Sequence, residues 1–211
     1  MHELLRIPAD DVHIEGMLEL PVDAKGLVLF AHGSGSSRHS PRNNHVAKVL
    51  HGQGIGTLLL DLLTLSEDLD YHTRFDISLL THRLLLATGF VRLHTPASRH
   101  LPIAYFGAST GAAAALQAAA GPGTDIQAVV SRGGRPDLAG AHDLARVTAP
   151  TLLLVGGLDT EVLELNRVAY ARLRCEKELT VIPNATHLFE EPGTLEEVAR
   201  LAADWFGRHW H

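Results

Sequence analysis

Short, almost unbroken apolar runs recur along the chain and predict a sheet that is covered on both faces. They fall at 26–33, 56–63, 102–109, 126–133, 150–157 and 178–183. Continuous apolar runs of this length are typical of parallel strands packed between two layers of helices. Ahead of them, residues 13–21 partly alternate between apolar and polar positions, as a half-buried strand does. We expect the preceding stretch LLRIPA to pair with that strand.

Helical patterns lie between these runs and set the fold class. They are predicted at 43–52, 75–94, 110–120, 161–174 and 195–210, with a shorter helix at 142–147. The alternation of strand and helix indicates an α/β fold with a mostly parallel, doubly wound sheet of about eight strands and right-handed crossovers. Because no linker or shift in composition divides the chain, residues 1–211 are expected to form a single domain without a sizeable lid.

Composition and charge narrow the class of partner. The 211 residues are 45% hydrophobic and 20% charged, which is typical of a soluble globular protein, and their net charge is −6. A negative chain lacks the basic face that nucleic acid requires, and no apolar run reaches the roughly 20 residues of a membrane helix. With no secretory signal and a lone cysteine, we expect a cytoplasmic protein, either a monomer or a homodimer.

Metal and cofactor chemistry has no visible motif, although the chain contains 14 histidines. None of them has the HExxH spacing, and no cluster of cysteine and histidine suggests zinc. We therefore expect neither a metal nor a cofactor.

The segment YFGASTGAAAAL carries the first chemical signal. It places Ser109 within a GxSxG pattern, where an apolar strand is expected to end and an alanine-rich helix to begin. A sharp turn at such a junction strains the serine backbone and exposes its hydroxyl, and it needs very small residues on either side. The helix N-terminus also favours the negative charge that develops during attack on a carbonyl. The alternative is a tightly packed glycine-serine corner without chemistry.

A serine hydroxyl needs a base, and in the template for this turn an acid and then a histidine follow the serine along the chain. Asp159 and His187 each follow a later strand and fit that order. Each also has an ordinary interpretation, because Asp159 suits the start of a helix and His187 suits a surface loop. Asp137 and Asp61 follow other strands and are rival acids, of which Asp137 is the stronger.

Two backbone N–H groups are expected to form the oxyanion hole. One is that of Thr110, directly after the nucleophile, and the other is that of Ser34 in the glycine-rich loop after the first apolar run. A phosphate-binding loop is the rival interpretation, but the required lysine and the GxGxxG spacing are absent.

Four arginines in loops after strands, namely Arg38, Arg42, Arg132 and Arg135, suit an anionic substrate group or ordinary surface ion pairs. We take Arg38 and Arg132 as the candidates for substrate binding, and Arg132 is the better placed because it directly follows an apolar strand.

Together these strings resemble the α/β-hydrolase superfamily, and most of all its small branch related to dienelactone hydrolases. The resemblance rests on LFAHGSGSSRHSPRN, GTLLLDLLT, YFGASTGAAAAL, VVSRGGRPDLAG, LLLVGGLDT and IPNATHLFEEPG, which cover nearly the whole chain. It implies hydrolysis of a small ester or lactone through an acyl-serine, without a cofactor. Ser109 stands where true dienelactone hydrolases have a cysteine. The alternatives are the same triad acting on a thioester or peptide bond, an acyltransferase, or a non-catalytic binding module.

Overall fold

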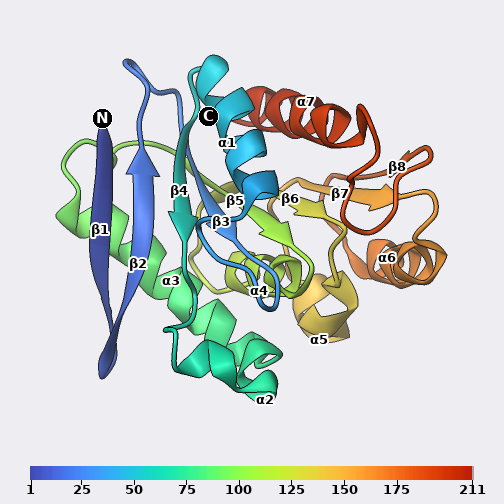
Figure 1. Cartoon of the computed structure of the whole chain (residues 1–211), viewed down its shortest axis with the longest axis horizontal. Coiled ribbons are helices and arrows are strands. Elements are labelled where there is room, and N and C mark those ends of the chain that lie inside the picture. Colours follow the sequence, from blue (N-terminus) through green and yellow to red (C-terminus); the bar gives the residue numbers. More distant parts are fainter. Residues whose placement is uncertain (211) are drawn as a thin grey trace.

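The computed structural model describes residues 1–210 and is built around one eight-stranded sheet (Figure 1). The strand order is β1-β2-β4-β3-β5-β6-β7-β8. The strands are β1 (His2–Ala9), β2 (Val12–Glu19), β3 (Leu27–Ala31), β4 (Gly56–Leu60), β5 (Ile103–Ala108), β6 (Ile126–Arg132), β7 (Thr151–Gly156) and β8 (Lys177–Ile182). All neighbours from β4 to β8 are parallel, whereas β2 runs antiparallel to both β1 and β4. The prediction of a mostly parallel sheet of about eight strands is confirmed.

Helices cover both faces of the sheet. They are α1 (Pro41–Gly52), α2 (Tyr71–Arg74), α3 (Ile77–His94), α4 (Thr110–Ala119), α5 (Ala141–Leu144), α6 (Thr160–Arg172) and α7 (Thr194–Arg208), with short 3₁₀ helices at Glu67–Leu69 and Pro136–Ala139. Figure 1 shows α1 and α7 on one side and α3, α4 and α6 on the other. The sequence predicted the longer helices to within about two residues. It missed α2 and the 3₁₀ helices, which are too short to show a periodic pattern.

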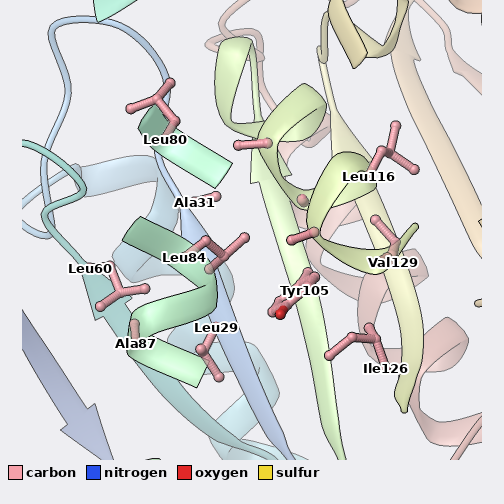
Figure 2. Close-up of a cluster of buried hydrophobic side chains, with 14 of the residues drawn as sticks. Leu29, Ala31, Leu60, Leu80, Leu84, Ala87, Tyr105, Leu116, Ile126 and Val129 are labelled. Carbon is pink, nitrogen blue, oxygen red and sulfur yellow. The ribbon is translucent and has the colours of Figure 1, made fainter. Parts of the chain in front are cut away.

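The two faces of the sheet carry two apolar layers. Figure 2 shows the first layer, where leucines of β3 and β4 meet Leu84 on α3 and the ring of Tyr105 on β5. The Tyr105 hydroxyl lies 2.8 Å from the hydroxyl of Thr88, and burial raises the pKa of this phenol to about 12. In the second layer, Trp205 and Phe206 of α7 are buried against the sheet. Because both faces are covered, β3 and β5 are buried at every position, which explains their unbroken apolar sequences.

The antiparallel β1–β2 hairpin contributes residues next to the candidate site. Its turn lies at the edge of the sheet where the parallel strands end, because β1 runs in the same direction as β4. The start of β2 therefore lies close to the loops that follow β3 and β4. Among residues 1–210, none of the helices combines the length and the apolar character that crossing a bilayer demands.

Candidate active site

Ser109 occupies a strained turn between β5 and α4. Its backbone has φ 50° and ψ −121°, a conformation that residues other than glycine rarely adopt. The flanking glycines are required by close contacts. A methyl group at Gly107 would lie 2.7 Å from the backbone nitrogen of Ala112, and one at Gly111 would lie 2.6 Å from the carbonyl oxygen of His32. The small residues of the motif therefore let α4 press directly against β3 and β5.

The loop after β6 clamps this turn from the other side. The backbone N–H of Arg135 donates to the Ser109 carbonyl oxygen at 3.0 Å. Asn166 on α6 is completely buried, and its amide donates to the carbonyl oxygens of Gly134 at 2.9 Å and Val162 at 2.8 Å. Asn166 thus connects α6 to the loop that holds Ser109. We did not single it out from the sequence, but its three-residue spacing from Leu163 and Ala169 on the buried face was a usable signal.

Asp159 and His187 are brought together. The Nδ1 atom of His187 lies 2.7 Å from Oδ2 of Asp159, and the two side chains are 41% and 15% exposed. Asp159 stands at the N-cap position of α6 but makes no side-chain capping bond, so its carboxylate is committed to the histidine. A proton on Nδ1 that faces a carboxylate leaves Nε2 free to accept another proton.

The rival acids are engaged elsewhere. Asp137 receives two hydrogen bonds from the Arg135 guanidinium, at 2.9 and 2.8 Å. Asp61 is paired with Arg38, which also donates its backbone N–H to this carboxylate at 2.6 Å. Of the three carboxylates considered from the sequence, Asp159 is the one that meets a histidine.

The loop that carries His187 is fixed to its neighbour. The N–H of Leu158, next to Asp159, donates to the carbonyl oxygen of Ala185 at 2.9 Å. Glu191 accepts from both the backbone N–H and the hydroxyl of Thr186, at 3.1 and 2.5 Å, and these bonds lower the pKa of this carboxyl. Asp159 and His187 are therefore held beside each other by their own loops.

Ser109 and His187 both contact the loop after β6. Within the part of the chain that the structure describes, no hydrogen bond joins Ser109 Oγ to His187. A methyl group at Gly133 would lie 3.1 Å from the His187 carbonyl oxygen and 3.7 Å from its Nδ1 atom, and Arg135 holds Ser109. Catalytic hydrogen bonds are often long until substrate is bound, so this arrangement suits a serine nucleophile and its base.

The loop after β3 forms the opposite wall. A methyl group at Gly33 would lie 2.9 Å from the Cβ atom of Ser109, so this loop packs directly against the serine. His32 fixes this loop. Its Nε2 atom accepts the Leu62 N–H at 2.9 Å, so the ring proton must lie on Nδ1, which donates to the Gly33 carbonyl oxygen at 2.8 Å. Burial lowers the pKa of His32, which keeps the ring neutral.

The two arginines considered for substrate binding differ sharply. Arg38 is paired with both Asp61 and Glu15, the latter at 2.7 Å. Arg132, in contrast, is only 8% exposed, and its buried Nη1 atom has no hydrogen-bond partner among residues 1–210. Burial, together with the charge of Arg42, lowers the pKa of Arg132 to about 10. Arg132 lies beside Ala108 in the sheet register, one residue from Ser109.

No group of three or more metal-binding side chains gathers within residues 1–210.

Among solved structures, a dienelactone hydrolase from Anabaena variabilis is 51% identical, with a TM-score of 0.94 over 100% of this chain and 99% of that one. The chain belongs to the dienelactone hydrolase family. It has the α/β-hydrolase fold. More distant esterases share this fold, among them Est1E from Butyrivibrio proteoclasticus (15% identity, TM-score 0.82, 98% of each chain) and an esterase domain from Rhodothermus marinus (19%, 0.79, 100% of each chain).

Two curated relatives carry a different kind of name. Two Mycobacterium tuberculosis proteins, named provisionally as phosphoribosyl transferases, are 56% identical over 98% of this chain. The chain spans about half (46%) of the length of these relatives. No family model matches the chain.

Proposed function

We propose that this dienelactone hydrolase family member cleaves a small carboxylic ester through an acyl-serine on Ser109, with His187 as base and Asp159 as the acid that orients it. The observation that carries the proposal is the 2.7 Å contact between His187 and Asp159, beside a strained serine turn. An acid that accepts from Nδ1 holds the imidazole in the tautomer that general-base catalysis needs. A lactone is hydrolysed by the same steps.

The reaction follows from these positions. His187 Nε2 takes the Ser109 proton while Oγ attacks the ester carbonyl carbon. The ester C–O bond then breaks, and the alcohol leaves with that proton. Water gives a proton to His187 and attacks the acyl-serine, the carboxylic acid departs, and the proton returns to Ser109. We assign the oxyanion hole to the N–H groups of Thr110, the residue after Ser109, and of Ser34, the residue after the Gly33 that packs on Ser109.

We also propose that Arg132 binds an anionic group, carboxylate or phosphate, on the alcohol part of the ester. A buried guanidinium without a carboxylate partner is costly, and a bound anion supplies the missing hydrogen bonds. Arg132 is the last residue of β6 and not part of the loop after it, as the sequence had suggested. Because β6 lies on the β8 side of β5, Arg132 lies on the His187 side of Ser109, where the leaving group must stand to receive its proton. Arg38 has two carboxylate partners, and we assign it to holding its loop.

The test of the nucleophile compares two serine variants. Ser109→Ala is expected to lose p-nitrophenyl acetate hydrolysis by at least about 10³-fold and to lose labelling by a fluorophosphonate probe. Ser78→Ala, on the exposed side of α3, is the matched control and should keep both. Unchanged turnover or labelling in Ser109→Ala would contradict the proposal.

The proposed role of Arg132 is tested by comparing an ester that has a charged leaving group with its uncharged counterpart. Arg132→Met is expected to raise KM for an aryl ester with a carboxylate on its leaving group by about tenfold or more, and to change KM little for the uncharged counterpart. Equal effects on both esters would show that the arginine acts on the fold.

For the mycobacterial relatives, we propose that any phosphoribosyl transferase activity belongs to the half of those proteins that this chain does not match.

A further inference from the structure

A large cleft lies at the active edge of the sheet, on the side of Ser109 that is remote from His187. Its volume is about 920 Å³, near the upper end for small-molecule sites. Three segments line it, namely the β1–β2 hairpin, the loop after β3 and the loop after β4. None of its lining residues belongs to the proposed triad.

The cleft continues toward the proposed oxyanion hole. His32 lines the cleft, and a methyl group at the next residue, Gly33, would lie 2.9 Å from the Cβ atom of Ser109. A carbonyl attacked by Ser109 therefore has one substituent that can extend into the cleft.

Strand order decides which substituent this is. The leaving oxygen must face His187, on the β8 side of β5, because it receives the proton from that ring. The cleft follows β3 and β4, on the other side of β5. The group that enters the cleft is therefore the acyl part of the ester.

Charge and polarity restrict the acyl group. The lining holds two arginines and three carboxylates, and Arg74 outside the lining pairs with one of these carboxylates, so neither an anionic nor a cationic group meets an excess of opposite charge. The carboxylates of Glu15 and Asp61 already share Arg38, and Asp68 is paired with Arg74. An additional cation is thus not needed. What is left is an apolar wall of Ile14 and Leu63 beside serine and threonine hydroxyls and carboxylate lone pairs.

We propose that this cleft binds the acyl group of the substrate and that this group is uncharged, hydroxylated and larger than acetyl. The inference rests on the proposed ester hydrolysis at Ser109. Carbon–hydrogen faces of the acyl group pack on Leu63, while its hydroxyls donate to the carboxylates and accept from Ser36 and Ser66. Hydrolysis of such an ester releases the alcohol and a hydroxy acid whose chain carries no further charged group.

The experiment compares methyl 3,4-dihydroxybutyrate with methyl butyrate, which have the same chain length, by following proton release. Wild-type kcat/KM is expected to favour the dihydroxy ester by about tenfold or more, because sites built around hydroxyls discriminate strongly against analogues that lack them. Leu65 is 92% exposed at the rim of the cleft, and Leu65→Trp should reduce that preference. Leu69→Trp, 84% exposed and outside the lining, is the matched control and should preserve it.

The outcomes separate the two proposals. Equal kcat/KM for the two esters, a preference for butyrate, or equal loss on both esters in Leu65→Trp overturns the inference. Absence of any ester turnover and of fluorophosphonate labelling overturns the proposed hydrolysis instead. In that case, calorimetric titration of methyl 3,4-dihydroxybutyrate into Ser109→Ala protein measures binding to the cleft. A Kd that Leu65→Trp weakens by about tenfold supports the cleft, and no binding or no change overturns it.

Discussion

Replacement of Gly111 by alanine tests how tightly the serine turn is packed. The added methyl would lie 2.6 Å from the His32 carbonyl oxygen and closer still to that of Ala31. Carbon and oxygen approach comfortably at about 3.3 Å, so the overlap is at least about 0.7 Å. Both oxygens belong to the backbone at the end of β3 and cannot rotate away. Helix α4 must therefore move off β3 and take Ser109 with it.

The matched control is Gly207→Ala, which lies in α7 with no atom within 4 Å of the added methyl. Both variants gain helix propensity, up to about 1 kcal/mol, so their difference isolates the clash. Overpacking of this kind costs about 1–3 kcal/mol, and a shift of about 1 Å in a nucleophile lowers the rate by roughly 100-fold. Urea unfolding and p-nitrophenyl acetate turnover measure the two effects. A Gly111→Ala protein as stable and active as the Gly207→Ala control would refute the reasoning.

Two further predictions follow from buried polar groups. Asn166→Ala removes the amide that holds Gly134 and should lower kcat by at least about tenfold with little change in KM, because the clamp acts on Ser109 and not on the substrate; an unchanged kcat would contradict this. The lowered pKa of His32 means that the unfolded chain binds its proton first as pH falls. The free energy of unfolding should thus decline below about pH 6.5, and this residue contributes up to about 1.4 kcal/mol per pH unit to that decline. Urea unfolding at several pH values measures it, and the decline should be shallower in His32→Gln than in the wild type.

Much of the fold was predictable because one physical pattern governs it. Strands such as β3 and β5 are buried on both faces, so their apolar runs are unbroken and easily recognised. The serine turn was also visible, since the glycines at 107 and 111 follow from local packing against neighbouring backbone. The pairing of Asp159 with His187 was predicted only from chain order, and the structure supplies their contact.

Other features depend on contacts between distant segments and leave little trace in sequence. Arg38 and Arg132 look alike as arginines in loops after strands. One is neutralised by Glu15, which arrives from the hairpin, and the other has no such neighbour among the described residues. The cleft is likewise formed by three segments that meet only in the folded chain. Charge compensation and cavities of this kind require the three-dimensional arrangement.

The position of His187 has a consequence for how the proposed hydrolysis would be lost. Its loop follows β8, an edge strand that pairs with β7 alone and is largely accessible, whereas Ser109 follows the fully covered β5. Edge elements with few buried contacts open at a lower free energy than the centre of a protein. Mild denaturant or heat should therefore detach the histidine while the serine turn is still folded, and amides of β8 should exchange with solvent before those of β5. Inactivation would then report the fraying of one strand, well ahead of global unfolding.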